Sequence, residues 1–400
     1  MKIGLTTTSF RWDQGAERFV VNLAKGLLTS GHEVHVIGRL EKSNILDEFL
    51  EQLSPDQQNR FFFHRVKTIK ATKYLNLITF AYAVHRVLKR HNFDVVQGFG
   101  KSLGLDVFRP PTGTHKAFLS AKKGKPNREP CTLLEYAIEK RLLFEQVKVL
   151  VVNSNLSLKR VRRAYPGITT PSRVIPNMVD LKYWQTENKS GQRNRLRSEW
   201  QLREDDIVFL HVSTSFVSKG VPEILEAYDR LKSGLSPQQH NRIKLVLVGD
   251  KSYRIPEKYK QEIRIYPRTN DVRPFFYAAD VLMHPTRFDS FANVVLESLA
   301  CGLPVVTTRY NGAIDAITDG SDGYIINEVD ADDIAGAISF FLDDNLRMEM
   351  SRSALKKSEQ FSPERITEQY VQLYETLAPQ IKLSKKNLTL WPWELFKGLK

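Results

Sequence analysis

The 400-residue sequence predicts an α/β fold with two domains, each built on a doubly wound parallel sheet covered by helices. Three observations lead to this prediction. The chain is longer than one hydrophobic core usually serves. Short apolar runs alternate with helical patterns along most of its length. The order strand, loop, helix, strand occurs at the start of the chain and again near its middle, so two similar halves are expected.

The first half opens on the apolar run KIGLTTTS, which predicts a strand, and a polar loop follows that ends at Gly15. The next segment, AERFVVNLAKGLLTSG, predicts a helix that Gly31 ends. The apolar residues that share one face of this helix are Phe19, Val20, Leu23, Leu27 and Leu28. EVHVIG predicts the second strand, and further strands are expected over Val95–Gln97 and Val147–Val152.

The later half repeats this plan with the strand DIVFLHVSTS, a loop to Gly220, the helix VPEILEAYDRLKSG and the strand IKLVLVGD. Two more strands are expected over Val281–His284 and Pro304–Thr307. RVIPNMVDLKYWQTENKSGQRN, a proline-marked turn before a polar stretch, is interpreted as the interdomain connection. We therefore expect a first domain over 1–180, a second domain over 181–370, and a C-terminal helix and tail over 371–400 that return to the first domain.

The net charge of +14 is concentrated in the first half. Residues 1–180 contain 29 Lys and Arg against 15 Asp and Glu, whereas residues 181–400 contain 30 of each kind. The first half should therefore attract polyanions, such as nucleic acid, an anionic membrane face or a phosphorylated substrate. A basic surface without a specific partner explains the same composition.

The cysteines and the hydropathy pattern favour a cytoplasmic protein. Cys131 and Cys301 are far apart and lack metal-ligand spacing, which argues against a disulfide framework or a zinc site. The start of the chain turns polar within a few residues, unlike a signal peptide. No stretch approaches the ~18 consecutive apolar residues of a membrane span. We expect a soluble protein that is cytoplasmic or peripheral on the cytoplasmic membrane face.

The most informative stretch is HPTRFDSFANVVLESLACGLPVVTT, which runs from His284 to Thr308. A buried strand leads into the polar loop TRFDSF, and a helix is expected to start near Ser290 to Asn293 and to end at Gly302 and Pro304. The first turn of a helix offers unpaired N–H groups and the positive end of the dipole, which suits a phosphate.

Two acids flank this anion site, Asp289 before the helix and Glu297 on it. Each carboxylate can accept hydrogen bonds from hydroxyl groups. The ligand that matches has phosphates in the middle and hydroxyls at both ends, as a sugar nucleotide does. Taken by itself, the stretch also fits an Asp289 that only caps the helix and a Glu297 exposed on its surface.

This stretch resembles the acid, seven residues, acid signature of retaining glycosyltransferase family 4, which has the GT-B fold of two facing Rossmann-like domains. Other segments follow in the family's order: GAER (15–18), VIPNMVD (174–180), SKGVPEILEA (218–227) and LESLACGLPVV (296–306). The segment GFGKSLGLDVF (98–108) is similar to the glucosyltransferases that extend the heptose region of the lipopolysaccharide inner core. The resemblance implies transfer of a hexose from a nucleotide-sugar, with UDP as the first guess, to a lipopolysaccharide core or another glycolipid.

The resemblance also implies a donor site. Glu297 would bind the ribose hydroxyls, Asp289 the transferred sugar, and Lys219 the diphosphate as a point charge. The residues that would contact the rest of the donor are Gly15 at the first loop, Phe291, Ala292 and Asn293 at the phosphates, and Arg268 near the base. His115 matches the position of an active-site histidine near the sugar, although TGTHKAF also fits a histidine with an ordinary loop role. The catalytic candidates are thus His115, Lys219, Asp289 and Glu297.

The positive groups of the expected site make a metal or another cofactor unnecessary, so none is expected. Three positions depart from the family pattern. Thr214, which we also place in the donor site, stands where arginine is usual, Asp289 where glutamate is commoner, and Ser218 where the core glucosyltransferases have arginine. The cations that are candidates to replace the missing charge are Arg268, Arg287 and Lys101.

The acceptor side is expected in the first domain, around Lys101, Asp106, Thr112 and Lys116. Basic residues cluster in this part of the sequence and favour a phosphorylated glycolipid at an anionic membrane face. The cluster is Lys101, Arg109, Lys116, Lys122, Lys123, Lys125 and Arg128. The tail LTLWPWELFKGLK is a second candidate for membrane contact, or it packs back onto the first domain.

Other functions stay open at this point. A sugar-nucleotide epimerase or a phosphorylase with the same fold would need further acid and base residues or a lysine for pyridoxal phosphate, and neither is identified. No GxGxxG follows the first strand, which disfavours a nicotinamide oxidoreductase. A non-enzymatic polyanion-binding protein would explain the charge, but no binding module with base-stacking aromatics is recognised, so nucleic acid is not expected as a partner.

Overall fold

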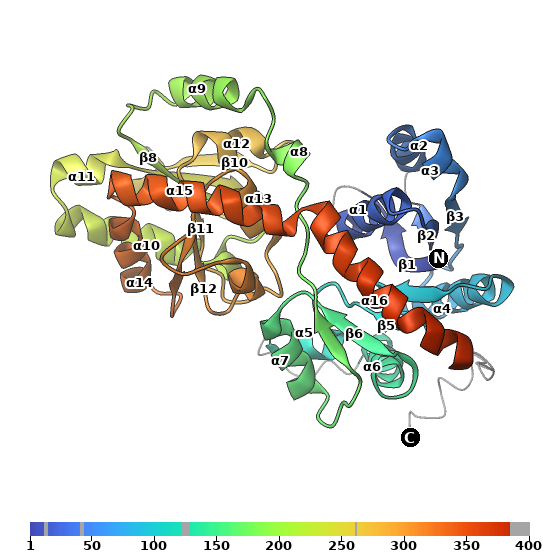
Figure 1. Cartoon of the computed structure of the whole chain (residues 1–400). Helices are drawn as coiled ribbons and strands as arrows, with labels where there is room; N and C mark the ends of the chain where they lie inside the picture. The colour runs from blue at the N-terminus through green and yellow to red at the C-terminus, as the bar shows by residue number, and fades with distance from the viewer. Residues whose placement is uncertain (12–14, 41–43, 122–128, 261, 385–400) are drawn as a thin grey trace. The chain divides into compact units, whose positions relative to one another are not determined.

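The computed structural model describes residues 1–11, 15–40, 44–121, 129–260 and 262–384, and the chain divides into two units (Figure 1). Unit 1 contains Met1–Asn177 together with the C-terminal segment from Pro363, and unit 2 contains Met178–Ser362. The chain thus crosses from unit 1 to unit 2 three residues before the expected boundary. It crosses back eight residues earlier than the expected one.

Unit 1 is built on a parallel sheet with the strand order β3-β2-β1-β4-β5-β6-β7. Its strands are β1 (Lys2–Phe10), β2 (Glu33–Leu40), β3 (Phe61–Arg65), β4 (Val95–Gly98), β5 (Val107–Phe108), β6 (Val149–Val152) and β7 (Ser172–Val174). Its helices are α1 (Gly15–Thr29), α2 (Asn44–Glu51), α3 (Pro55–Asn59), α4 (Lys73–Arg90), α5 (His115–Ala121), α6 (Pro130–Arg141), the π-helical turn η1 (Leu142–Gln146), α7 (Asn155–Ala164) and α16 (Pro363–Ser384).

Unit 2 is built on a parallel sheet with the strand order β10-β9-β8-β11-β12-β13. Its strands are β8 (Ile207–Ser213), β9 (Ile243–Gly249), β10 (Arg264–Pro267), β11 (Val281–His284), β12 (Val305–Thr308) and β13 (Gly323–Ile326). Its α-helices are α8 (Leu181–Trp184), α9 (Lys189–Glu199), α10 (Val221–Gly234), α11 (Pro237–Arg242), α12 (Arg273–Ala278), α13 (Asn293–Ala300), α14 (Ala331–Phe340) and α15 (Asp344–Ser358). Short 3₁₀ turns are η2 (Val217–Lys219), η3 (Glu257–Tyr259), η4 (Gly312–Ala316) and η5 (Glu359–Phe361).

Successive side chains of a central strand pack against helices on opposite faces of the sheet of unit 2. Along β8, Ile207 and Phe209 belong to one core cluster with residues of α10 and α14, whereas Val208 and Leu210 belong to another with residues of α12 and α13. Successive residues of a strand point to opposite faces, so a strand buried on both faces is apolar throughout. The predicted fold class, two doubly wound parallel-sheet domains, is confirmed.

The helix α16 belongs to unit 1 although it ends the described chain. It packs on α1, where Tyr370 contacts the ring of Phe19, and the Tyr374 hydroxyl donates to Oε1 of Gln97 over 2.7 Å. Gly26 of α1 permits this approach, because a Cβ there would lie 2.2 Å from the Thr367 hydroxyl. The part of the expected C-terminal segment over 371–384 therefore packs on unit 1. The tryptophan-rich part of the tail lies outside the described residues.

The expected interdomain connection is mostly regular structure. Its first residues belong to β7, and its polar part forms α8 and α9. Arg193 and Arg197 of α9 donate to the carboxylate of Asp280, over 2.7 and 3.1 Å, and the same carboxylate accepts the Val208 N–H. The charges that suggested a linker thus attach α9 to the sheet of unit 2.

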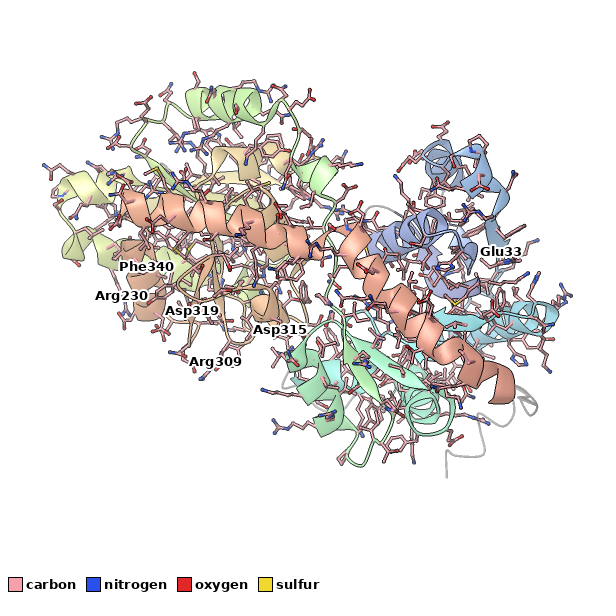
Figure 2. All side chains as sticks on the ribbon, in the orientation of Figure 1. Glu33, Arg230, Arg309, Asp315, Asp319 and Phe340 are labelled. Carbon is pink, nitrogen blue, oxygen red and sulfur yellow. The ribbon has the colours of Figure 1, made fainter. Side chains whose placement is uncertain are left out.

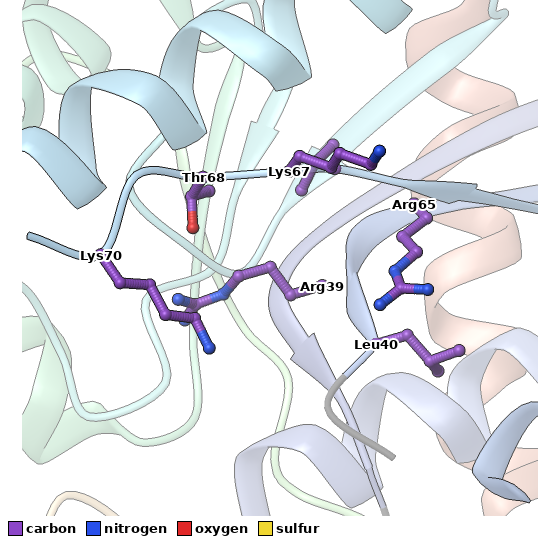
Figure 3. A pocket seen from close by; sticks show the side chains of 7 residues that line it. Arg39, Leu40, Arg65, Lys67, Thr68 and Lys70 are labelled. Carbon is purple, nitrogen blue, oxygen red and sulfur yellow. The ribbon is translucent and has the colours of Figure 1, made fainter. Parts of the chain in front are cut away.

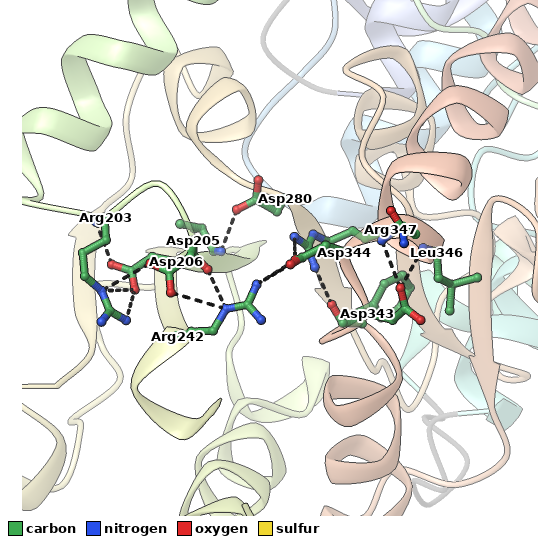
Figure 4. Close-up of polar contacts among 12 residues, drawn as sticks. Arg203, Asp205, Asp206, Arg242, Asp280, Asp343, Asp344, Leu346 and Arg347 are labelled. Carbon is green, nitrogen blue, oxygen red and sulfur yellow. Dashed lines mark hydrogen bonds and ion pairs between the residues drawn. The ribbon is translucent and has the colours of Figure 1, made fainter. Parts of the chain in front are cut away.

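A second ion-pair network lies at the amino ends of β8 and β9. Arg203 contacts Asp206, and Arg242 binds both carboxylate oxygens of Asp344 over 2.6 and 2.9 Å (Figure 4). Ligands of open parallel sheets bind at the opposite, carboxyl edge. This network therefore stabilises the amino edge of the sheet, and the carboxyl edge stays available for a site.

The cations on the surface of unit 2 are commonly paired. Arg230 contacts Glu226 and Asp332, and Arg309, labelled with it in Figure 2, contacts Glu328. The balanced charge of the second half is thus visible as local ion pairs. Among the described residues, no helix is both long enough and apolar enough to span a bilayer.

Candidate active site

The strand order of unit 2 places two loops side by side at its carboxyl edge. From β8 the chain continues through β9 to β10 on one side, and β11 returns to pair with β8 from the other side. This reversal is a topological switch point, which is where open α/β sheets bind ligands. The loop after β8 carries Thr214 and Lys219, and the loop after β11 carries Asp289.

Lys219 joins these two loops. Its Nζ donates to Oδ2 of Asp289 over 2.6 Å, to the Phe288 carbonyl over 3.1 Å and to Oγ1 of Thr286 over 3.2 Å. An ammonium group has three donors, so all three are engaged within the protein. The side chains of the Lys219 and Asp289 pair keep 18% and 22% of their exposure, so both groups still meet solvent at the edge of the sheet.

Gly220 sets the direction of the chain behind Lys219. Its φ of +78° is left-handed, and a Cβ there would lie 2.4 Å from the Pro285 carbonyl oxygen. Only glycine fits both constraints without strain. The predicted loop up to Gly220 and the helix that begins at Val221 are both confirmed.

The helix α13 begins at Asn293, within the predicted range. Its N-cap residue is Ala292, which has no side-chain oxygen to cap the first turn. Asp289 instead accepts the Phe291 N–H over 3.1 Å, and Asn311 accepts the Ala292 N–H over 3.2 Å. The N-cap residue therefore makes no side-chain cap, and the polar side chains of Asp289 and Asn311 bind the two residues before the helix.

The end of α13 also follows the sequence prediction. Gly302 adopts a φ of +72°, and the Leu303 N–H donates to the Ser298 carbonyl over 2.9 Å. Glu297, predicted as a donor-binding acid, lies one turn into this helix and is partly exposed. Phe291 and Ala292 are buried, and their N–H groups are engaged within the chain by Asp289 and Asn311.

A pocket of about 430 Å³ lies at the end of β10, in the place predicted for the base. It is lined by Tyr266, Pro267, Arg268, Thr269, Asn270 and Phe275. Aromatic rings and backbone groups of this kind suit a flat heterocycle. Arg268 has no hydrogen bond or ion pair with the rest of the described chain, whereas Arg287 is paired with Glu223. Of these two candidates to replace the charge of the usual arginine, only Arg268 has no carboxylate partner among the described residues. Thr214, which stands in the place of that arginine, is exposed.

Two buried histidines lie beneath Lys219. His211 and His284 stack at 5.8 Å between ring centroids, and His211 Nδ1 lies 2.8 Å from the Met283 carbonyl. Burial lowers the pKa of His211 to about 4, with the Met283 carbonyl opposing this shift and the Lys219 charge adding to it. Burial and the Lys219 charge also hold the pKa of His284 well below its usual value. Both rings are therefore neutral at pH 7, so the charges at this point are those of the Lys219 and Asp289 pair.

In unit 1, the structure brings the predicted residues Lys101 and His115 to one carboxylate that the sequence did not single out. Glu135 of α6 forms an ion pair with Lys101 through Oε1, and its Oε2 lies 3.0 Å from Nε2 of His115. Burial lowers the pKa of His115; Glu135 opposes this effect and Lys101 adds to it. His115 is thus held as a neutral imidazole at pH 7.

Glu139, one helical turn after Glu135, supports the same loop. Its carboxylate accepts the backbone N–H groups of His115 and Lys116, and it accepts the Tyr165 hydroxyl over 2.7 Å. Burial raises the pKa of this carboxyl, although these hydrogen bonds oppose the shift. Two acids four residues apart lie on one face of a helix. That spacing in PCTLLEYAIEKR is the sequence signal that could have predicted both residues.

Two predicted residues of unit 1 have other roles. Asp106 lies at the amino ends of β4 and β5, where it accepts the Val96 N–H over 2.8 Å, so it supports the sheet at the edge opposite to His115. Arg109 is only 2% exposed, with its guanidinium 3.7 Å from the centre of the Phe19 ring and 2.6 Å from Oδ1 of Asn177. It is therefore not part of a basic surface, because α1 covers it.

Two further predicted residues of unit 1, Thr112 and Lys116, lie at its surface. Thr112 is exposed, and Lys116 is partly exposed, with its Nζ 4.8 Å from the centre of the Tyr165 ring. Gly15 is the first residue of α1. Lys122, Lys123, Lys125 and Arg128 lie outside the described residues. Within the described ranges, no three His, Cys, Asp or Glu side chains gather as a metal site requires.

Comparison with known proteins identifies the family. Residues 14–183 match the model of Glycosyltransferase Family 4, and residues 192–358 match that of Glycosyl transferases group 1. The chain therefore belongs to the glycosyltransferases that these two models describe, with one matched domain in each half. The prediction of an enzyme of the glycosyltransferase class is therefore confirmed, and the two matches cover the carboxyl-edge loops described above.

Individual relatives of this glycosyltransferase agree with that assignment. The chain is 26% identical over 323 residues to the lipopolysaccharide glucosyltransferase WaaG of Escherichia coli K12, and the alignment covers 78% of this chain and 82% of the relative. A crystal structure of WaaG superposes with a TM-score of 0.70 at 22% identity, over 93% of this chain and 99% of the other. Anabaena HepE in complex with UDP-glucose gives a TM-score of 0.66 at 17% identity, over 94% and 100% of the two chains. These structures share the GT-B fold with the present chain.

Proposed function

We propose that this glycosyltransferase moves a hexose from a UDP-sugar to a saccharide acceptor of the lipopolysaccharide-core type, with retention of the anomeric configuration. The observation that carries the proposal is the pairing of Lys219 with Asp289 beside the uncapped start of α13, at the switch point of unit 2. The relative that acts on lipopolysaccharide and the neighbour that binds UDP-glucose support the choice of acceptor and donor.

The chemistry follows from the charge that develops on the leaving group. When the sugar leaves, negative charge grows on the diphosphate, and preorganised positive groups stabilise that charge. Here these groups are the Lys219 ammonium and the amides of the first turn of α13. Because both belong to the protein, we propose that no metal is needed.

The acids take the hydroxyl-rich ends of the donor in this proposal. Glu297 accepts hydrogen bonds from the ribose, one turn along the helix from the phosphates, about 6 Å at 1.5 Å per residue. Asp289 binds the transferred sugar while its other contacts order the loop. His115, neutral and beside Glu135, is proposed as the active-site histidine near the transferred sugar.

The test compares wild type, Glu297→Ala and a matched control, Glu349→Ala, which removes an exposed acid of α15 in the same unit. Calorimetry and thermal shift with UDP, GDP, ADP and their hexose conjugates are run with Mg²⁺ and with EDTA. A ligand that binds the native state raises its apparent stability. We expect stabilisation by the uridine series in EDTA, lost in Glu297→Ala and kept in the control. Equal stabilisation of Glu297→Ala would disprove the assigned role, and no response to any nucleotide would refute the proposed function.

We further propose that the enzyme works as a cytoplasmic protein at an anionic membrane face, where a glycolipid acceptor would be presented. The basic excess of the first half supports this location, because anionic lipids attract clustered Lys and Arg. Vesicles of phosphatidylglycerol should bind the protein at low salt and release it at high salt. Absence of binding at low salt would remove the membrane from the proposal.

A further inference from the structure

A pocket of about 720 Å³ lies in unit 1 at the carboxyl ends of β2 and β3, and no predicted site residue lines it (Figure 3). Its lining consists of Arg39, Leu40, Arg65, Val66, Lys67, Thr68 and Lys70. Four of these seven residues are cations, and none is acidic. The carboxyl edge of a parallel sheet is the edge at which ligands bind.

Three of the four cations have no compensating group among the described residues. Arg65, Lys67 and Lys70 are exposed, and they form no hydrogen bond or ion pair with another described residue. In unit 2, by contrast, Arg230, Arg242 and Arg309 each contact a carboxylate. Like charges gathered without counterions repel one another. An anion bound in the pocket would relieve this repulsion.

The fourth cation is held in position by the fold. Arg39 donates from Nε to the Thr8 carbonyl over 2.8 Å and from Nη1 to Oδ1 of Asn76 over 3.3 Å. These bonds, to β1 and to α4, fix the plane of the guanidinium. The Nη2 of Arg39 has no partner among the described residues. A fixed guanidinium fork suits the bidentate binding of a phosphate.

A hydroxyl group completes the pocket. Oγ1 of Thr68 is buried and has no hydrogen-bond partner in the described structure. Figure 3 shows this oxygen pointing into the pocket on the side of the Arg39 guanidinium. Buried polar atoms are nearly always hydrogen-bonded in native proteins, so one without a partner indicates a missing ligand or water. The hydroxyl is a second feature, independent of the charges, that points to a polar ligand.

We propose that this pocket binds a phosphomonoester carried by the acceptor saccharide, an inference that rests on the proposed transferase function. A phosphomonoester has a charge of about −1.5 to −2 at pH 7 and three acceptor oxygens. A carboxylate has one charge and two oxygens, which matches four cations less well. The volume of the pocket exceeds that of a phosphate group, which leaves room for the sugar that carries it.

The position of the pocket also defines where the phosphate lies on the acceptor. Lys101 and His115 follow β4 and β5, whereas the pocket follows β2 and β3 on the same sheet. Three strand spacings, roughly 14 Å in total, separate the two places. A phosphate and a reacting hydroxyl that far apart belong to different residues of an oligosaccharide.

The test uses the full chain and the double variant Arg65→Gln, Lys67→Gln, whose side chains are exposed and form no hydrogen bond or ion pair with another described residue. The control, Lys89→Gln, Arg90→Gln, removes the same charges from the exposed end of α4, which leads to the amino ends of the strands. Binding of glucose 6-phosphate, inorganic phosphate and glucose is measured by NMR titration. Binding of UDP and binding to phosphatidylglycerol vesicles are measured on the same samples.

We expect glucose 6-phosphate to bind wild type and the control alike, and to bind the pocket variant at least tenfold more weakly, while glucose itself does not bind. Equal affinity of the pocket variant and the control would overturn the inference. So would a variant that loses vesicle binding but keeps glucose 6-phosphate, because the cations would then serve a lipid surface. UDP affinity should stay unchanged in the pocket variant. If wild type did not bind UDP, the proposed transferase function would be refuted, whatever the result with glucose 6-phosphate.

Discussion

The strongest test of the donor site is Lys219→Met, which removes one charge and keeps a side chain of similar length. In the structure the Nζ of Lys219 makes three hydrogen bonds, the shortest of them to Asp289 at 2.6 Å. Removing one preorganised donor to a developing negative charge typically lowers kcat by about 10²–10³, or roughly 2.7–4 kcal/mol. Since Asp289 already neutralises part of the charge, we expect the lower end, about 10²-fold.

The variant also leaves the Asp289 carboxylate facing the diphosphate without its lysine. A second variant, Lys219→Met with Asp289→Asn, separates this repulsion from the lost attraction. If repulsion contributes, UDP should bind the double variant more tightly than the single one. Lys356→Met, which changes an exposed lysine of α15, is the matched control.

The assay is release of UDP from a UDP-hexose at saturating donor, with circular dichroism and thermal unfolding to confirm that each variant is folded. A folded Lys219→Met enzyme with kcat within about threefold of wild type would refute the electrostatic role of Lys219. An equal loss in Lys356→Met would show that the effect comes from net charge and not from position.

Three further predictions concern stability and proton binding. Gly220→Ala should lower the free energy of unfolding by at least about 1–2 kcal/mol, because the φ of Gly220 is +78° and a Cβ there would lie 2.4 Å from a carbonyl oxygen. The control Gly234→Ala, where a Cβ meets nothing within 4 Å, should change it by less than about 1 kcal/mol. Urea denaturation measures both effects, and equal effects would contradict the assigned strain. Glu135→Gln should lower the pKa of His115 further, since Glu135 is the group that raises it; NMR titration would show this, and an unchanged or higher pKa would disprove the contact. The pKa of His211 is about 4 in the folded chain and 6.5 in the unfolded one, so the unfolded state binds more protons between these values. Stability from this residue is therefore complete above pH 6.5 and falls by up to about 1.4 kcal/mol per pH unit below it, and His211→Gln should show a shallower loss of stability from pH 6.5 to 4 in denaturation at several pH values.

The fold class and most strands were predictable because their signals are local. The apolar runs of β1, β2, β8, β9 and β11 are contiguous, and the helices that follow them carry apolar residues at helical spacing. Short or half-polar strands were not predicted. FFFHR in β3 follows a polar helix, and β5 and β7 have only two and three residues, so their pairing depends on neighbouring strands.

The two acids proposed for the donor site were singled out from one stretch of sequence, because Asp289, the start of α13 and Glu297 lie within nine residues of each other. Their roles stay predictions, but the helix start at Asn293 was determined by local pattern alone. The role of Asp106 could not be read in the same way. Its neighbours are set by the pairing of β4 with β5, which brings Val96 to its carboxylate.

The sequence by itself determined the two parallel-sheet domains, the loops at their carboxyl edges, and the glycines that turn the chain at 220 and 302. Each of these depends on residues close together in the chain. Only the tertiary structure decided which charges meet: Lys219 with Asp289 across 70 positions, Lys101 and His115 on Glu135, and Arg39 beside Lys70 without an acid. Strand order sets these encounters, and strand order follows from packing over the whole domain.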